Sequence, residues 1–342
     1  MVRWSQCFEI VKNDPNIETE YTYGEQYGWD SDRLRDHWNT WITEDDFKEI
    51  ASVGLNFVRL PIGYWSIIGG QGAPFVYGAY DYVGKAVGWA GNHGIKVMLD
   101  LHGAPRSQNG FDNSGQLKST PEWTQGDSVE VTLKALNKLR DDFGSNPNVA
   151  SIELLNEPLG PSLDMDTVRQ FYMDGWGNLK GTNVAVAFHD AFEGVNSWND
   201  WGSGMWNLLL DTHHYEVFDS GALQMSPDEH VGTACGFGSQ MASNNKWTIA
   251  GEWSGALTDC AKVSIESSLP STRLQHTNKI TVAQRSRYWR KIRRHLQQGR
   301  SRILLHWLMR RKVHWFRQGS QRRRPLQHQA LHRSTVRRIR EG

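Results

Sequence analysis

Helical and strand-like segments alternate along the chain from about residue 42 to residue 254, and this alternation is the feature that most constrains the fold. Each helical segment carries apolar residues on one face and is followed by a short apolar run with strand character. Repeated βα units of this length predict a parallel sheet with helices packed against it. The predicted strands are Leu55–Pro61, Ile95–His102, Val149–Glu157, Val184–His189, Asn207–Tyr215 and Trp247–Glu252.

The helical segments have recognisable ends. Thr43 and Asp46 have the spacing of a capping box, and Gly54 follows that segment as a C-terminal cap would. Gly94 and Gly144 follow two later segments in the same way. The predicted helices are 43–53, 80–93, 128–143 and 165–180.

The alternation alone fits either a doubly wound sheet or a barrel, and the polar residues decide between them. They recur at the carboxyl ends of the predicted strands, and only a barrel brings so many strand ends to one site. We therefore predict an α/β fold of the (β/α)8 TIM-barrel type. The strand-end residues are Arg59, His102, Asn156, Glu157, His213, Tyr215 and Glu252.

The charge distribution divides the chain near Lys262. Residues 263–342 carry 21 lysines and arginines against two acidic residues, whereas residues 1–262 carry 17 against 35. A globular domain rarely changes sign so abruptly. We predict a barrel region over 1–262 and a poorly ordered, irregular basic tail over 263–342.

We interpret this tail as the product of a reading-frame shift or a mis-splice near residue 262. Charge, aspartate content and hydrophobic periodicity all change at that point. The less favoured alternative is a basic arm that binds nucleic acid, because basic runs also occur in proteins with no such partner.

The sequence lacks the motifs that are typical of several other functional classes. Cys7, Cys235 and Cys260 are an odd, widely spaced set, which gives neither a disulfide framework nor a metal-binding spacing. No glycine loop of the phosphate-binding type and no Gly-x-Ser-x-Gly elbow is present. The amino-terminal residues show no signal-peptide pattern, and no apolar run is long enough to span a bilayer. We expect no cofactor, no metal and no membrane partner.

Two glutamates offer the chemistry that cleaves a glycosidic bond. Glu157 and Glu252 each follow an apolar strand run. Cleavage requires one carboxyl that holds a proton for the leaving oxygen and one carboxylate that faces an oxocarbenium-like carbon. A glutamate at a strand end is more often an ion-paired rim residue. The preceding Asn156 favours catalysis here, because its amide can hydrogen-bond the 2-hydroxyl of the reacting sugar.

Neighbouring residues are predicted to serve these carboxyls or the sugar. Arg59 and Tyr215 would keep Glu252 ionised and oriented, although a structural salt bridge is an equal alternative for Arg59. His102 and His213 are predicted to hydrogen-bond the sugar or a carboxylate.

The sequence holds 16 tryptophans, and aromatic rings can stack on sugars. Core packing is the commoner role for such residues. Phe111 and Phe218 lie just past strand ends, so we predict these two as sugar platforms. The other aromatic candidates are Trp65, Trp123, Trp198, Trp201 and Trp253.

Six stretches, taken in order, carry a family resemblance that is far more specific than any one motif. They are Trp38–Phe47, Leu55–Trp65, Asp100–Gly115, Ile152–Gly160, Asp211–Phe218 and Ala250–Lys262. In sequence and spacing they resemble the fungal exo-β-1,3-glucanases of glycoside hydrolase family 5. The resemblance covers about residues 34–262.

The resemblance implies a function and assigns roles to residues. Glu157 would be the acid/base and Glu252 the nucleophile of a retaining double displacement that releases glucose from β-1,3-glucan. It also implies an extracellular or cell-wall location, a β-glucan oligosaccharide or polysaccharide as partner, and a monomer. The active-site positions that match the family are Arg59, His102, Asn156, His213 and Tyr215.

The resemblance stops before both ends of the chain. The family's first strand is not recognisable before Trp38, and its last strand is not recognisable after Lys262. We therefore expect an incomplete barrel. Two alternatives to the glucanase activity remain open. One is a catalytically inactive carbohydrate-binding protein, and the other is a related specificity, such as β-1,6-glucan or a glucolipid, set by the loop 103–126.

Overall fold

A computed structural model of the protein describes residues 14, 16–28, 32–256 and, for the backbone, 302–303. Internal packing divides the chain into Met1–Leu308 and Met309–Gly342, and the second unit lies wholly outside the described residues. The helices are α1 (Glu20–Tyr27), α2 (Asp32–Thr40), α3 (Glu44–Ser52), α4 (Tyr64–Ile68), α5 (Tyr80–Asn92), α6 (Ser128–Phe143), α7 (Met165–Leu179) and α8 (Pro227–Ser243). The strands are β1 (Phe57–Gly63), β2 (Lys96–Gly103), β3 (Val149–Glu153), β4 (Ala185–His189), β5 (Leu208–His214), β6 (Trp247–Trp253) and β7 (Arg302–Ile303).

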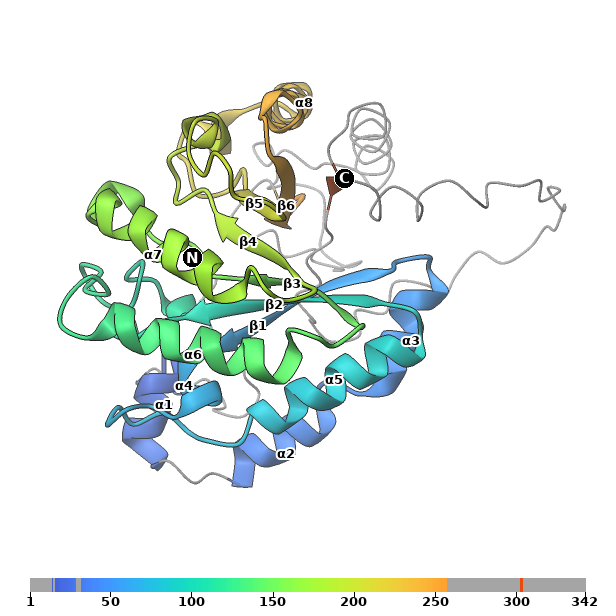
Figure 1. Cartoon of the computed structure of the whole chain (residues 1–342). Helices are drawn as coiled ribbons and strands as arrows, with labels where there is room; N and C mark the ends of the chain where they lie inside the picture. Colours follow the sequence, from blue (N-terminus) through green and yellow to red (C-terminus); the bar gives the residue numbers. More distant parts are fainter. Residues whose placement is uncertain (1–13, 15, 29–31, 257–301, 304–342) are drawn as a thin grey trace, which may run out of the picture. The chain divides into compact units, whose positions relative to one another are not determined.

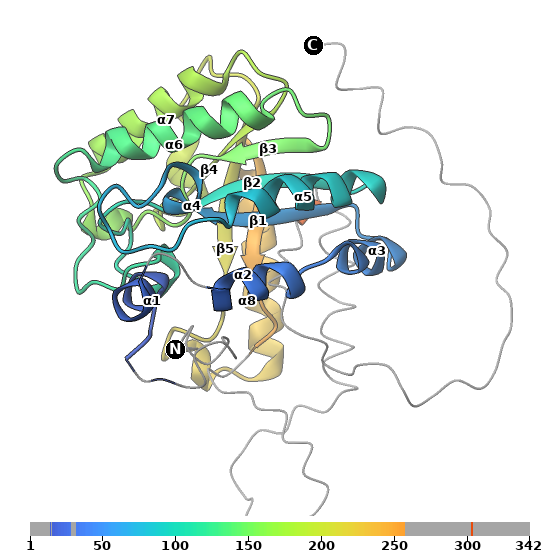
Figure 2. The same cartoon turned by 90° about the horizontal axis from the view of Figure 1, so that it is seen from below.

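These strands form one parallel sheet whose spatial order follows the sequence, from β1 to β7. The sheet curls, and α5, α6 and α7 lie along its outer side (Figures 1 and 2). A doubly wound sheet would change strand order and place helices on both faces. The sequential order and the curl therefore confirm the predicted barrel type over that alternative.

The predicted elements match the structure closely. All six predicted strands are confirmed as β1 to β6, and the four predicted helices are confirmed as α3, α5, α6 and α7. One strand is shorter than predicted, because β3 ends at Glu153 and residues 154–157 leave the sheet. Helices α1, α2 and α4 were not predicted, and neither was the longest described helix, α8. It buries His230, Ala234 and Met241 out of 17 residues, so its apolar stripe is weak.

The ends of the sheet bear on the prediction of an incomplete barrel. Within the described residues no strand precedes Phe57, and β1 forms one edge of the sheet. At the other edge, Arg302 and Ile303 of β7 pair with Ile249 and Ala250 of β6. This short strand lies within the segment predicted as an irregular tail. The rest of that tail, with its reading-frame or splice hypothesis and its nucleic-acid alternative, lies outside the described residues.

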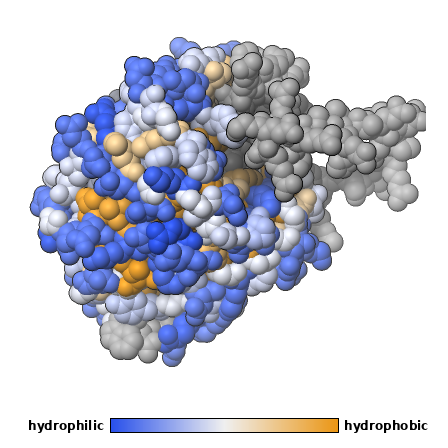
Figure 3. Space-filling view, viewed as in Figure 1, coloured by the Kyte–Doolittle hydropathy of each residue, from blue (hydrophilic) through white to orange (hydrophobic). Residues whose placement is uncertain are grey.

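Apolar side chains from alternate strands pack together on the inner side of the curled sheet. Met98 of β2, Ala187 of β4 and Ile249 of β6 form a buried cluster, with Phe57 and Leu209 packed against it. Layers built from alternate strands are the usual filling of a barrel. Hydrophilic residues cover the outer surfaces of the helices, and apolar ones show mainly between them (Figure 3). Among the described residues, none of the helices has the length and apolar character that would let it cross a membrane.

Two glycines of α7 provide a test of how this helix packs. An added Cβ at Gly175 would lie 2.7 Å from Leu154 Cδ2, whereas none of the described atoms lies within 4 Å of an added Cβ at Gly177. Gly177→Ala should raise the free energy of unfolding by about 1 kcal/mol through helix propensity. Gly175→Ala should lower it by roughly 1–3 kcal/mol, because Leu154 is fully buried and has no room to move. Urea unfolding measures both. A stabilised Gly175→Ala would contradict the described packing.

Candidate active site

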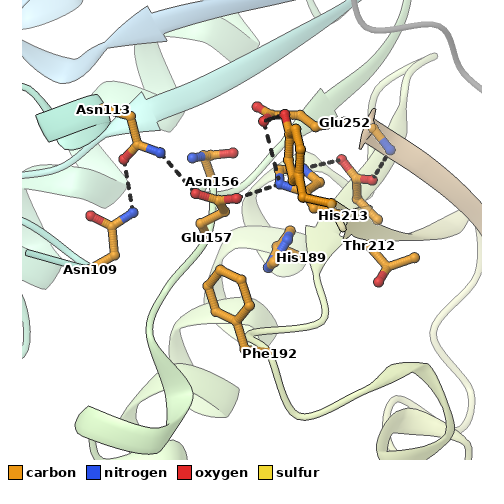
Figure 4. A network of polar contacts seen from close by, with 12 residues as sticks. Asn109, Asn113, Asn156, Glu157, His189, Phe192, Thr212, His213 and Glu252 are labelled. Atoms are coloured by element: carbon orange, nitrogen blue, oxygen red, sulfur yellow. Dashed lines mark hydrogen bonds and ion pairs between the residues drawn. The ribbon is translucent and has the colours of Figure 1, made fainter. Parts of the chain in front are cut away.

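The predicted strand-end residues converge at the carboxyl edge of the sheet. Arg59 comes from β1, His102 from β2 and His213 from β5. Glu157 lies four residues beyond β3, and Glu252 is the penultimate residue of β6. Figure 4 shows Asn156, Glu157, His213 and Glu252 gathered in one polar network. The structure thus brings together residues that are up to 193 positions apart in the sequence.

Arg59 is the centre of this network and is 2% exposed. Its Nη1 donates to Glu252 Oε1 at 2.9 Å, and its Nη2 donates to Asn156 Oδ1 at 2.7 Å. Its Nε donates to Glu153 Oε2 at 2.8 Å. Two further carboxylates lie close to it, with Asp100 Oδ2 at 3.1 Å and Asp211 Oδ2 at 3.5 Å. The Arg59 guanidinium therefore orients one candidate catalytic glutamate, Glu252. It also orients the side-chain amide of Asn156, the residue next to the other candidate, Glu157.

The four carboxyls around Arg59 do not share one charge state. Burial alone would lower the pKa of Arg59, but Asp100, Glu153, Glu252 and Asp211 together raise it well above its ordinary value. Burial raises the pKa of Glu153 well above its usual range. Arg59 lowers this pKa and the nearby Asp211 and Asp100 raise it, so the net shift is upward. Burial would also raise the pKa of Asp100, yet Arg59 and His102 outweigh it and lower that pKa. These shifts favour the protonated acid at Glu153 and the carboxylate at Asp100.

Both carboxyl oxygens of Glu157 have a hydrogen-bond partner. Asn113 Nδ2 donates to Oε2 at 2.9 Å, and His213 Nδ1 lies 2.6 Å from Oε1. Asn109 Nδ2 in turn donates to Asn113 Oδ1 at 3.0 Å. Figure 4 shows this chain of contacts from the loop after β2 to Glu157.

The backbone at Glu157 is strained, since its φ is 47°. Non-glycine residues at positive φ are uncommon and often lie at functional sites. Neighbouring contacts hold the turn: Asn156 N donates to Leu101 O at 2.9 Å, and Gln108 Nε2 donates to Asn156 O at 2.9 Å and to His102 O at 2.8 Å. Gln108 therefore ties the ends of β2 and β3 together beneath the candidate acid.

His213 lies between the two glutamates. Its Nδ1 is 2.6 Å from Glu157 Oε1 and 3.7 Å from Glu252 Oε2. Burial alone would lower the pKa of His213, but Glu252 and Glu157 outweigh it and raise that pKa well above its ordinary value. The short contact between His213 Nδ1 and Glu157 Oε1 is a single hydrogen bond, whose direction depends on which of the two groups carries the proton.

Glu252 is fixed by groups from two strand regions, β1 and the carboxyl end of β5. Arg59 contacts Oε1, and the Tyr215 hydroxyl donates to Oε2 at 2.7 Å. Burial, followed by the charge of Glu252, raises the pKa of Tyr215 far above its ordinary value, so this hydroxyl keeps its proton. The preceding residue is fixed as well, because Gly251 N donates to Asp211 Oδ1 at 2.5 Å. The contacts predicted for Arg59 and Tyr215 with Glu252 are present.

His102 takes a different partner from either glutamate. Its Nδ1 lies 2.6 Å from Asp100 Oδ2. Asp100 thus joins His102 to Arg59, and His102 is 8% exposed at the end of β2.

The predicted aromatic platforms fall into two groups. Phe111 is 40% exposed and Phe218 is 68% exposed, and the Phe218 ring lies 5.5 Å from the Tyr215 ring. Of the other candidates, Trp65, Trp123 and Trp198 are buried in the core. Phe192, which was not predicted, is 42% exposed beside His189 (Figure 4).

A trio of metal-ligating side chains also lies here. Ligand atoms of Glu157, His189 and His213 lie within 4.8 Å of one another. Burial, then His213, lowers the pKa of His189 well below its ordinary value, so its ring is neutral. Ala191 N donates to its Nδ1 at 3.1 Å, which leaves the hydrogen on Nε2. That tautomer cannot ligate a metal through Nε2, so the trio in this form does not suit a metal site.

Sequence reasoning missed the second layer of this site. Asp100, Glu153 and Asp211 are single acidic residues inside apolar strand runs, and that pattern could have indicated them. Asn113 and Gln108 gave no such signal, because they lie in a polar loop. Their roles depend on how the loop folds back over β3.

Comparison with known proteins identifies the family. Residues 21–269 match the family described as Cellulase (glycosyl hydrolase family 5). The chain belongs to glycosyl hydrolase family 5. This confirms the family resemblance that the six sequence stretches indicated.

Curated relatives of this family 5 chain are glucan 1,3-beta-glucosidases. That of Blumeria graminis is 47% identical over 262 residues, which cover 75% of this chain and 61% of the relative. Glucan 1,3-beta-glucosidase 2 of Wickerhamomyces anomalus is 44% identical over 266 residues, which cover 75% and 62%. The chain thus spans about three fifths of the length of these relatives.

A solved structure supports the fold of the family 5 chain. The rutinosidase from Aspergillus niger matches with a TM-score of 0.69 and 18% identity, over 85% of this chain and 82% of that one. At this identity the match supports the architecture alone.

The charge states around Arg59 can be tested with two isosteric amides. Glu153→Gln replaces a neutral acid and should change the free energy of unfolding by less than about 1 kcal/mol. Asp100→Asn removes a buried charge that faces Arg59 and His102, so it should cost roughly 3–5 kcal/mol. Chemical denaturation at neutral pH compares the two variants. Equal losses would show that Glu153 is ionised as well.

Asp190, at the end of β4, provides a test of pH dependence. Burial raises the pKa of Asp190 to about 6, although hydrogen bonds from the Thr212 hydroxyl and Phe192 N act to lower it. A raised folded-state pKa gives stability that is complete below the unfolded pKa and is lost as pH rises through the folded value. Asp190→Asn should therefore gain up to roughly 3 kcal/mol relative to the native protein between about pH 4 and pH 7. Urea unfolding at both pH values measures this. The exposed change Asp141→Asn is the control, and a pH-independent difference for Asp190→Asn would contradict the assignment.

Proposed function

We propose that this protein is a retaining glycosidase that releases glucose from the end of β-1,3-glucan. The observation that carries the proposal is the position of His213 Nδ1, 2.6 Å from Glu157 Oε1 and 3.7 Å from Glu252 Oε2. These two oxygens cannot lie further apart than the sum of the two distances. For this pair of oxygens the limit is below the roughly 6.5 Å at which the carboxyl separations of inverting enzymes begin, and this favours retention.

In the proposed reaction Glu252 is the nucleophile. It attacks the anomeric carbon and forms a glycosyl ester, while Glu157 gives its proton to the departing oxygen. Water then attacks the ester, Glu157 takes its proton, and Glu252 leaves with the anomeric configuration restored. Arg59 and Tyr215 support these roles because each donates to one oxygen of Glu252 and so holds it in position.

Substrate binding is proposed for the groups around this pair. Asn156 uses Oδ1 to accept from Arg59, and its buried Nδ2 has no partner among the described residues. That amide hydrogen suits the 2-hydroxyl of the reacting sugar. Phe111 and Phe218 are proposed as platforms for the leaving sugar, since both are exposed near the site.

The names of the relatives support the substrate, since the two reported above are glucan 1,3-beta-glucosidases. The exo mode, the extracellular or cell-wall location and the monomeric state remain predictions. They rest on the resemblance of the sequence to its family.

Variants of the two glutamates separate their proposed roles. Glu252→Gln should lower kcat at least about 1,000-fold on laminarin and on every aryl β-glucoside, because it removes the nucleophile. Glu157→Gln should lose as much on laminarin but keep rapid glycosylation with a dinitrophenyl β-glucoside, whose leaving group needs no proton. Release of dinitrophenol measures the difference. Glu130→Gln, an exposed change on α6, is the control.

The first product identifies the stereochemistry and the mode of attack. Proton NMR should show β-glucose as the initial product, and laminarin should yield glucose without a ladder of oligosaccharides. Initial α-glucose would overturn retention. A folded native protein without activity on laminarin or aryl glucosides would favour the inactive carbohydrate-binding alternative.

A further inference from the structure

A second cluster of ionisable residues lies behind the active site, between the end of β5 and α8. Glu216 Oε1 lies 2.8 Å from His214 Nε2, and Glu216 Oε2 hydrogen-bonds His230 Nδ1 of α8. Glu216 is 4% exposed and His230 is 2% exposed. None of these three residues contacts Glu157 or Glu252 in the hydrogen bonds and ion pairs described above. We call them the His–Glu–His clamp.

The charge state of the clamp defines its hydrogen bonds. Burial would raise the pKa of Glu216, but the hydrogen bonds from His214 and His230 outweigh it and lower that pKa. Glu216 is therefore a carboxylate that only accepts, so each histidine donates a ring N–H to it. A buried carboxylate with a donor on each oxygen has a defined orientation.

Alternation along the backbone connects the clamp to the candidate nucleophile. Successive side chains of an extended segment point to opposite sides. His213 and Tyr215 point to the glutamates, whereas His214 and Glu216 point to α8. His214 also stacks on Phe237 of α8, with ring centroids 4.3 Å apart and planes inclined by 20°. The clamp thus fixes α8 to the residues on both sides of Tyr215.

We propose that Glu216 is a positioning residue that holds Tyr215 against Glu252 by anchoring residues 214–216 to α8. The inference rests on the proposed function, because it assigns Tyr215 the task of orienting the nucleophile. Within the described part of the chain, the hydroxyl of Tyr215 contacts the site through the 2.7 Å bond to Glu252 Oε2. Without the anchor on either side of it, that hydroxyl would no longer be held at a fixed distance from the carboxylate.

Two substitutions at one position open and restore the clamp. His230→Leu removes the hydrogen-bond donor on α8 without altering the amino-acid sequence of residues 213–218. His230→Asn instead places an amide N–H near the position of Nδ1. We expect His230→Leu to lower kcat/KM on an aryl β-glucoside about tenfold, equivalent to about 1.4 kcal/mol of transition-state stabilisation. His230→Asn should stay within about threefold of the native value. Glu229→Gln, next to His230 in α8, is the control, because Glu229 caps the helix at Ser226 and is not part of the clamp.

A double-mutant cycle distinguishes positioning from general loosening of the fold. Tyr215→Phe removes the hydroxyl that the clamp is proposed to aim. If Glu216 and His230 act through this hydroxyl, His230→Leu should lower kcat/KM less than about twofold further in the Tyr215→Phe background. A full tenfold loss in that background would overturn the inference. So would native kcat/KM in His230→Leu.

Amide hydrogen exchange gives a readout that does not require activity. His230→Leu should speed exchange at residues 213–218 and leave exchange in α6 unchanged, because only the anchored segment is released. Glu216→Leu removes both acceptor oxygens and serves as a second variant with the same expected pattern. Unchanged exchange at 213–218 in both variants would overturn the clamp, whatever the activity. An inactive native protein whose variants show the faster exchange would instead overturn the proposed function and leave the clamp in place.

Discussion

The burial of Arg59 among carboxyls from four other strands is the interaction on which the rest of the site depends. A buried guanidinium is tolerated only where anions and hydrogen-bond acceptors replace its water. Asp100, Glu153, Asp211 and Glu252 supply them, one each from β2, β3, β5 and β6. The same polar contacts therefore hold the strands in register at this edge and fix the position of Glu252.

This arrangement explains why the two candidate catalytic glutamates have different surroundings. Glu252 is held by Arg59 and Tyr215, groups that suit a carboxylate facing positive charge. Glu157 is held by His213 and by Asn113 of a loop, on a backbone turn with positive φ. The ring of His213 contacts both glutamates, so a change of charge at one of them alters the surroundings of the other. Chemistry of the glycosidase type needs this division of roles between two nearby carboxyls.

Residues that do not themselves contact the side chains of the two candidate catalytic glutamates make the site rigid. Gln108 ties the ends of β2 and β3 together, and Asp211 holds the peptide that precedes Glu252. The clamp of His214, Glu216 and His230 extends this support to α8. Function in a barrel of this kind therefore depends on packing and hydrogen bonds well outside the residues that would touch a sugar.

The sequence by itself determined the order and type of β1 to β6 and four of the helices, because hydrophobic periodicity is a local property of the chain. It also placed Arg59, Asn156, His213, Tyr215 and both glutamates at one edge, since parallel strand ends converge in a barrel. Helix α8 was missed because few of its residues are buried. The partners of each group, such as Asp100 for His102 and Asn113 for Glu157, were decided only by the tertiary structure. Such pairs join residues from different strands and loops, and their distances depend on the curl of the sheet and the path of the loops, which local sequence patterns do not encode.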